Sequence, residues 1–329
     1  MMHGKKSGKL RHQHERPGGS WDELITAGSG SASDQDAAIV IYVGSARCRA
    51  VYHEDEIDVV VPSGIAVKQK SMLAVGDRIR VEGEAGSWRL ESILPRHSAL
   101  ARPDPLRPHM QRLIAANIDV VVHVVSVKAP PLRPRLIDRY LIAIMRGGAK
   151  PVVCVNKIDL LDDEERREEL ARLDVYRALV PVIACSTRTG EGLDALRAEA
   201  EGKTTALVGH SGVGKSSILN AIDQRLQLVT NTLHRRGTGR HTTTASTLYD
   251  FGGGTYLIDT PGIREFGLWD LDRSTLRDYF PEFDEPSESC RFTDCTHVHE
   301  PHCEVKERLQ RGELNAARYE TYLRLYEEI

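Results

Sequence analysis

Residues 204–217 read TTALVGHSGVGKSS, and this stretch decides the fold of the chain. A short apolar run leads into a glycine-rich loop that matches the pattern G-x-x-x-x-G-K-[ST] at 209–216, and a helix-forming segment follows directly. The glycines let backbone N–H groups turn toward phosphate oxygens, and the start of the helix adds its positive end. The sequence therefore predicts a strand, a phosphate-binding loop and a helix in that order.

The phosphate-binding loop supplies most of the predicted nucleotide contacts. These come from Gly209, His210, Ser211, Gly212, Val213, Gly214, Lys215, Ser216 and Ser217. Lys215 is expected to place its charge on the β- and γ-phosphates in a catalytic role, and the Ser216 hydroxyl is expected to bind Mg²⁺. A second segment, DTPG, ends the strand-like run TYLID. There Asp259 is predicted to hold magnesium through water, and the Gly262 N–H to contact the γ-phosphate.

Two further segments indicate that the base is guanine. Asn156-Lys157-Ile158-Asp159 closes the strand-like run PVVCVN. The Asp159 carboxylate can accept hydrogen bonds from both N1–H and the 2-amino group of guanine, whereas adenine lacks that amino group. Asn156 is predicted to buttress the loop and Lys157 to lie across the base. After the next strand, VPVIAC, the backbone at Ser186 and Thr187 can meet the guanine carbonyl, so a P-loop ATPase is disfavoured.

The order of these segments is unusual, because both base-reading loops precede the phosphate loop. In an ordinary GTPase they follow it. Joining the old ends of such a domain and cutting it elsewhere changes the order but keeps every strand neighbour. Apolar strands alternate with helix-length segments over 113–280, which predicts an α/β domain with a mostly parallel sheet and helices on both faces.

The flanking regions predict four further parts of the chain. Residues 1–35 are polar and basic and predict a disordered tail, whereas 36–97 contain short alternating β-branched runs separated by turns, typical of an OB-type RNA-binding barrel. Residues 98–112 form a linker rich in proline and arginine, where a helix or a central strand is disfavoured. Residues 281–329 are expected to form a small α-helical module around a metal.

Cysteine and histidine cluster near the C-terminus in the pattern C-x₄-C-x-H-x₅-C. The three cysteines are Cys290, Cys295 and Cys303, and His297 completes four ligands, with His299 and His302 as competing candidates. Three thiolates and one imidazole fill a tetrahedral Zn²⁺ shell without an open position, so a structural zinc is predicted. The other three cysteines, Cys48, Cys154 and Cys185, lie singly in apolar runs, which is consistent with a reducing compartment.

The composition and charge of the chain limit the classes of protein, the cellular location and the partners that can be expected. The 329 residues are 40% hydrophobic and 28% charged, and no apolar run approaches the roughly 20 residues needed to span a bilayer. The N-terminal segment lacks the apolar core of a secretory signal, so we expect a cytoplasmic protein that does not bind membranes. The net charge of −3 excludes a uniformly basic nucleic-acid binder, but basic residues gather in 1–20, 96–139 and 225–240. These stretches and the barrel together predict an RNA partner.

The full set of motifs resembles the ribosome small-subunit-dependent GTPase A family. The resemblance covers about residues 38–328, through ILPRHSALARP, ANIDVVVHVVSV, NKIDL, GHSGVGKSS, GRHTTTAS, DTPGIREFGL and the cysteine module. It implies a bacterial enzyme that binds the small (30S) ribosomal subunit and its rRNA late in assembly and hydrolyses GTP to GDP and phosphate there. It also implies His297 as the zinc ligand and Thr243, beside Thr242 and Thr244, as a magnesium ligand.

The residue that orients the attacking water is not obvious from the motifs. The position just after DTPG, which carries a glutamine in many switch GTPases, is Ile263 here. His241 lies in the polar stretch 231–246, which resembles a switch loop, and an imidazole can orient water or accept a proton. We therefore expect His241 to be a catalytic residue. We also expect the protein to be a monomer whose slow GTP hydrolysis is stimulated by its partner. The alternative is a non-catalytic RNA-binding scaffold whose affinity for RNA is controlled by the bound nucleotide.

Overall fold

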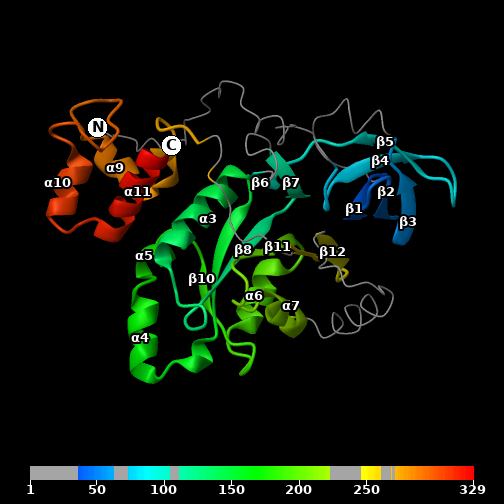
Figure 1. Cartoon of the computed structure of the whole chain (residues 1–329), viewed down its shortest axis with the longest axis horizontal. Helices are drawn as coiled ribbons and strands as arrows, with labels where there is room; N and C mark the ends of the chain where they lie inside the picture. Colours follow the sequence, from blue (N-terminus) through cyan, green and yellow to red (C-terminus); the bar gives the residue numbers. More distant parts are fainter. Residues whose placement is uncertain (1–35, 63–72, 104–110, 223–245, 261–267, 269–270) are drawn as a thin grey trace, which may run out of the picture.

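The computed structural model describes residues 36–62, 73–103, 111–222, 246–260, 268 and 271–329. Three parts lie in a row (Figure 1): a barrel, a central domain built on a sheet, and a helical C-terminal module on the far side of the central domain from the barrel. The central domain therefore contacts both of the other parts. Within the described residues, no helix is long and apolar enough to cross a membrane.

The N-terminal part is a closed five-stranded barrel with the strand order β1-β2-β3-β5-β4. Pairing of β1 with β4 closes it, and β3 pairs with β5 in parallel. The alternating side chains Val40, Ala50, Val59, Ile79 and Leu90 fill its interior, because successive residues of a strand point to opposite faces. The strands are β1 (Ala38–Val43), β2 (Arg47–Tyr52), β3 (Asp55–Val60), β4 (Arg78–Glu82) and β5 (Arg89–Ile93). The predicted OB-type barrel is confirmed.

The segment expected to be a linker, 98–112, contains one strand and the beginning of a second. Strands β6 (Ala99–Pro103) and β7 (Gln111–Ala116) pair antiparallel as a separate two-stranded sheet. Their small apolar side chains, such as Ala101 and Ala115, are buried. Pro103 is tolerated because it ends a strand that pairs, among the described residues, with β7 alone. The prolines therefore exclude a central strand, as expected, but they do not exclude a hairpin at the side of the domain.

A buried ion pair connects the barrel to this hairpin. Arg96 donates to both carboxylate oxygens of Asp77, at 2.6 and 2.8 Å, and the Ala74 N–H donates to the same carboxylate at 2.8 Å. Arg96 is only 4% exposed. The side chain at the start of the basic stretch 96–139 therefore does not face a partner, which corrects part of the RNA-contact prediction for that stretch.

The central domain contains a six-stranded sheet with the order β10-β9-β8-β11-β13-β12. All neighbours pair in parallel except β12, which is antiparallel to β13 at one edge. The strands are β8 (Val120–Ser126), β9 (Lys150–Asn156), β10 (Val182–Ala184), β11 (Thr204–Val208), β12 (Thr247–Asp250) and β13 (Tyr256–Asp259). The mostly parallel sheet predicted from the alternation of strands and helices is confirmed.

Helices cover both faces of this sheet because its central strands are apolar on both sides. Helix α3 (Pro134–Arg146) packs on one face, where Tyr140 and Ile144 share a core with the barrel residue Ile41. Helices α6 (Leu193–Ala200) and α7 (Lys215–Ile222) pack on the opposite face. The helix α4 (Asp163–Ala171) buries no side chain, as its charge pattern predicts, and α5 (Asp174–Arg177) and the 3₁₀ turn η1 (Ile158–Leu160) complete the domain.

The C-terminal module surrounds a core of aromatic side chains and cysteines, including Phe280, Phe283 and Tyr322. Its elements are the 3₁₀ turns η2 (Leu276–Tyr279) and η3 (Pro281–Phe283) and the helices α9 (Asp284–Ser287), α10 (Glu304–Gln310) and α11 (Ala316–Glu328). Helix α11 docks on α3 through Arg318, which is 3% exposed and bonds both Asp138 and Glu282. Removing one partner would leave a buried unpaired charge, so this contact fixes the module on the domain.

Candidate nucleotide and metal sites

The phosphate-binding loop connects β11 to α7, as its sequence predicts. Two of its glycines are required by close contacts. At Gly209 (φ 139°) a Cβ atom would lie 2.2 Å from the Val124 carbonyl oxygen, and at Gly214 (φ 99°) it would lie 2.3 Å from Asn156 Nδ2. Any other side chain would push the loop off the sheet. The backbone N–H groups of the loop and the start of α7 are thus held at the carboxyl edge of the sheet.

Lys215 and Asp259 place opposite charges beside this loop. The Lys215 ammonium donates to the Gly209 and His210 carbonyl oxygens at 2.7 and 3.0 Å. Burial lowers the pKa of Lys215 and raises the pKa of Asp259, and the attraction between the two opposes both shifts. Asp259 ends β13, the strand that pairs with β11, so its carboxylate lies near the start of α7. Lys215, Ser216 and Asp259 can therefore act on the same phosphates and the same cation.

A cavity of about 130 Å³ borders the first residues of the loop, His210 and Ser211, and extends to the end of β8 and the start of α3. His123 forms part of its wall and stacks on Tyr140, with the ring centroids 3.8 Å apart. Burial, with smaller effects from His210 and Lys215, lowers the pKa of His123 to about 3. Its imidazole is therefore neutral and adds no charge to the phosphate site.

The first base-reading segment is braced against the phosphate loop. Asn156, at the end of β9, donates from Nδ2 to the Val213 carbonyl oxygen at 2.9 Å. Lys157 donates from Nζ to the carbonyl oxygens of Ala129 and Gly212, both at 2.6 Å. The two loops are adjacent in space although 55 and 57 residues separate the bonded pairs. Asn156 thus takes the buttressing position expected of it, and Lys157 spans from one loop to the other.

Asp159 lies where β9 and β10 end, and its carboxylate has two side-chain partners. Ser186 donates to Oδ1 at 2.5 Å, and Arg188 donates from Nε to Oδ2 at 2.7 Å. The bond from Ser186, with a smaller effect from Arg188, lowers the pKa of Asp159, so the group is an ionised acceptor. The sequence interpretation uses only the backbone at Ser186 and Thr187 and misses the Arg188 side chain, although the position of Arg188 directly after these residues is a usable signal.

Gly262, His241 and Thr243 lie outside the described residues, together with the neighbouring Thr242 and Thr244. Among the described ones, Ser216 and Ser217 begin α7 with exposed side chains, and Thr187 is half-buried after Ser186.

The predicted metal ligands converge in the C-terminal module. The ligand atoms of Cys290, Cys295, His297 and Cys303 all lie within 4.8 Å of one another. His297 Nδ1 is 3.4 Å from the Cys303 sulfur and 3.7 Å from the Cys290 sulfur. His299 and His302 are exposed and lie outside this cluster. A group of three sulfur atoms and one imidazole nitrogen at this spacing can hold a metal ion.

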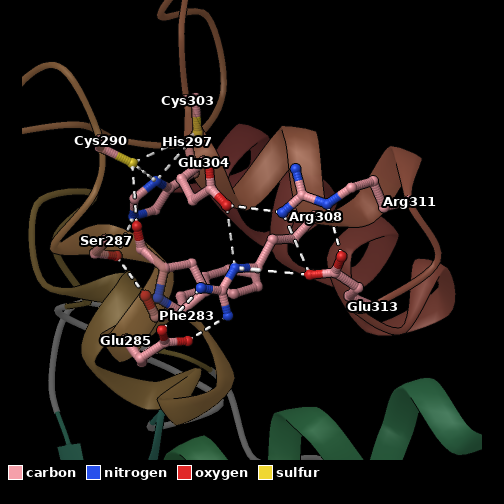
Figure 2. Close-up of polar contacts among 11 residues, drawn as sticks. Phe283, Glu285, Ser287, Cys290, His297, Cys303, Glu304, Arg308, Arg311 and Glu313 are labelled. Atoms are coloured by element: carbon pink, nitrogen blue, oxygen red, sulfur yellow. Dashed lines mark hydrogen bonds and ion pairs between the residues drawn. The ribbon is translucent and has the colours of Figure 1, made fainter.

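Hydrogen bonds set the orientation of the His297 ring (Figure 2). Nε2 lies 3.0 Å from the Ser287 oxygen, and the Ser287 hydroxyl donates to the Phe283 carbonyl at 2.5 Å. Ser287 must then accept from Nε2–H, which leaves the lone pair of Nδ1 facing the sulfurs. Burial lowers the pKa of His297 to about 4, so the ring is neutral as a metal ligand must be.

Glu300 fixes the loop between His297 and Cys303. It accepts hydrogen bonds from the Thr296 N–H and hydroxyl at 2.8 and 2.7 Å, and from the N–H groups of Val298 and His299 at 3.2 Å. Burial alone would raise its pKa, but these bonds lower the pKa to about 2. The carboxylate therefore stays ionised and holds the loop in the shape that presents His297 to the sulfurs.

The loops for phosphate and base all meet at one edge of the sheet. They follow β9, β10, β11 and β13, and the chain reaches the two base-reading loops before the phosphate loop. Ligands of open parallel sheets bind at this carboxyl edge. The strand order and the loops together define a P-loop GTPase domain in circular permutation.

The chain belongs to the RsgA GTPase family, whose family model matches residues 93–269. It is 39% identical over 264 residues to the small ribosomal subunit biogenesis GTPase RsgA of Gemmatimonas aurantiaca, covering 78% of this chain and 84% of that protein. The protein of the same name from Pectobacterium carotovorum is 42% identical over 271 residues, covering 79% of this chain and 76% of its own length.

Two solved structures are similar to this chain over most of its length. YjeQ from Thermotoga maritima superposes with a TM-score of 0.73 at 32% identity, covering 89% of this chain and 98% of YjeQ. YloQ, described as a circularly permuted GTPase, superposes with a TM-score of 0.70 at 29% identity, covering 89% of this chain and 94% of its own length. The resemblance inferred from the motifs is confirmed.

Proposed function

We propose that this protein binds the small ribosomal subunit during its biogenesis and hydrolyses GTP there. The observation that carries the proposal is the bracing of the base-reading loop on the phosphate loop, through Asn156 and Lys157. One ligand can then meet Asp159 at its base and Lys215 at its phosphates. The relatives named above are small ribosomal subunit biogenesis GTPases, which supplies the partner class.

In this proposal each side chain has a separate task. Asp159 accepts from the guanine N1–H and 2-amino groups, held by Ser186 and Arg188. Lys215 neutralises charge on the β- and γ-phosphates. Magnesium would be held by the Ser216 hydroxyl and by Asp259, with Thr243, outside the described residues, as a third candidate ligand. A bound Mg²⁺ neutralises charge that develops on the phosphates during hydrolysis.

The metal in the C-terminal module is proposed to be Zn²⁺ with a structural role. Thiolates and a neutral imidazole favour zinc over magnesium or calcium, which prefer oxygen ligands. Four protein ligands leave no position for a catalytic water. The metal would fix the loop that carries His297, and helix α11 packs on this loop. Tyr319 and Tyr322 of α11 donate hydrogen bonds to the carbonyl oxygens of His297 and Thr296 at 2.7 and 2.5 Å.

The partner is proposed to be ribosomal RNA, reached through the OB-type barrel and the basic tail. The stretch 96–139 contributes less than its composition suggests, because Arg96 is buried, Arg135 pairs with Glu320 and Arg139 pairs with Glu328. A monomer working in the cytoplasm, where ribosomal subunits are assembled, remains our prediction.

Phosphate release measures the proposed function directly. We expect slow hydrolysis of GTP by the isolated protein and a rate at least about tenfold higher with small ribosomal subunits, because partner binding orders catalytic groups. ATP should be a poor substrate. Large ribosomal subunits serve as the control partner. Subunit binding that responds to GTP without any phosphate release would instead favour the nucleotide-controlled RNA-binding scaffold.

The water-orienting residue is proposed to be His241. Replacing it by alanine should lower the subunit-stimulated rate by about 10²–10⁴-fold, the usual contribution of a positioned general base, and leave GTP affinity nearly unchanged. Single-turnover phosphate release and equilibrium binding of a fluorescent GTP analogue separate the two quantities. His299→Ala, in an exposed position of the C-terminal module, is the matched control. A stimulated rate equal to that of the parent protein would exclude His241.

A further inference from the structure

Two cysteines that are 31 residues apart in the chain meet behind the base-reading loops. The sulfur atoms of Cys154 on β9 and Cys185 just after β10 lie 3.2 Å apart. Both side chains are fully buried in the core shared with α6 and α7. Each looks like an ordinary apolar core residue in the sequence, and only the pairing of β9 with β10 brings the two thiols together.

This thiol pair is linked by hydrogen bonds to both halves of the nucleotide site. The Cys185 thiol donates to Asn156 Oδ1 at 3.6 Å, and the other end of the same amide donates to Val213 in the phosphate loop. The Cys185 carbonyl accepts from the Ile158 N–H at 3.3 Å. The next residue, Ser186, donates to Asp159. Any movement of Cys185 therefore reaches both the base-reading carboxylate and the brace on the phosphate loop.

We propose that Cys154 and Cys185 form a modifiable dithiol, and that its oxidation to a disulfide lowers the affinity of this protein for guanine nucleotides. The oxidant class is a small disulfide such as oxidised glutathione. The inference rests on the proposed placement of the base at Asp159, Ser186 and Asn156.

The chemistry balances as two successive thiol–disulfide exchanges. One cysteine thiolate attacks the small disulfide, forms a mixed disulfide and releases one small thiolate. The second cysteine, as thiolate, attacks the protein sulfur of the mixed disulfide and releases the other small thiolate. The protein loses two protons and two electrons, and the small disulfide is reduced to two thiols. Excess reduced thiol reverses both steps.

Access to the buried pair comes from the edge of the sheet. Strand β10 has three residues, Val182–Ala184, and lies at one end of the strand order, so β9 is its only strand partner among the described residues, and its side chains are only half-buried in the cores on either face. Short edge strands open locally at low free-energy cost. The contact with Cys185, together with burial, raises the pKa of the Cys154 thiol, which keeps that thiol protonated and unreactive while the strand is closed. Oxidation is then expected to follow opening of β10.

The disulfide is expected to alter the nucleotide site in two ways: it removes the Cys185 S–H donor, and it moves the chain at the end of β10 toward β9. A disulfide holds its sulfurs about 2 Å apart, closer than the thiols are here. The Cys185 S–H bond to Asn156 is lost, and Cys185 moves toward Cys154, which displaces Ser186 from Asp159. Because each buried hydrogen bond contributes about 1 kcal/mol, loss of one or two of them should lower the affinity by about five- to thirtyfold relative to the reduced protein.

The test uses the full-length, metal-loaded protein incubated in glutathione buffers of graded ratio. Peptide mass spectrometry detects the Cys154–Cys185 crosslink, and a fluorescent GTP analogue reports affinity. We expect the crosslink and the affinity loss to appear over the same range of ratios, and both to reverse with dithiothreitol. Cys154→Ala removes the crosslink but keeps the Cys185 thiol, so its affinity should not respond to the buffer. Cys154→Val refills the space if the alanine variant folds poorly.

Cys48→Ala is the matched control, because Cys48 is buried in the barrel away from this pair and its loss should leave the response intact. The metal-binding cysteines are the same in every variant, and metal content is measured in parallel. The proposal is overturned if no Cys154–Cys185 crosslink forms, if the crosslink leaves affinity unchanged, or if Cys154→Ala loses affinity as the parent does. Failure of the reduced parent protein to bind GTP would instead contradict the proposed function.

Discussion

Asp159→Asn should reduce GTP affinity by about a hundredfold or more. Two hydrogen bonds to an ionised carboxylate contribute about 3 kcal/mol together, and the asparagine amide presents a donor where guanine needs an acceptor. Arg188 can turn away from the new amide because its side chain is 73% exposed. Folding should therefore be little affected.

The same replacement should reverse base preference. Xanthine carries a carbonyl oxygen where guanine carries the 2-amino group, and the asparagine amide can donate to it. We expect Asp159→Asn to bind xanthosine triphosphate better than GTP, measured by competition against a fluorescent nucleotide. Asp163→Asn, an exposed carboxylate in the first turn of α4, is the matched control and should retain the GTP preference. Equal GTP affinity in parent and Asp159→Asn would place the base elsewhere.

Cys303→Ser should abolish metal retention and unfold the C-terminal module. Cys303 is buried, its sulfur lies 4.0 Å from the Cys290 sulfur, and α10 begins at the next residue, Glu304. Structural zinc sites contribute about 10–16 kcal/mol of apparent binding free energy, more than a core of this size can supply by itself. The Phe283, Tyr319 and Tyr322 rings would lose the loop on which they pack.

Metal analysis after dialysis and near-ultraviolet circular dichroism of the module's tyrosines test this expectation. The parent should hold one zinc per chain and the variant close to none. Cys48→Ser, in the barrel core, controls for loss of a buried thiol and should retain the metal. Because α11 docks on α3 through Arg318, loss of the module should also expose Asp138. A variant that keeps a full equivalent of zinc would contradict the assignment of Cys303 as a ligand.

Local patterns in the sequence predicted the strands, the loops and the chemistry of each site. The glycines of 209–214 and the carboxylate at Asp159 are recognisable because a phosphate cradle or a base-reading loop is built from consecutive residues. The barrel and the parallel sheet followed from hydrophobic periodicity. The prolines of 98–112 indicate only that a helix or a central strand is disfavoured, and they do not reveal the pairing of β6 with β7, because that pairing depends on burial of small residues against the domain.

What the sequence determined by itself was the identity of the groups that act: the loop at 209–216, Asp159, and the cysteines and histidine of the C-terminal module. Only the tertiary structure decided which of them meet. Arg188 on Asp159, Asn156 on the phosphate loop, Cys154 beside Cys185 and Arg318 between Asp138 and Glu282 are all contacts between segments brought together by strand order and helix docking. Periodicity and motif spacing contain no information about such neighbours, because they describe one segment at a time, whereas these contacts depend on how separate segments pack.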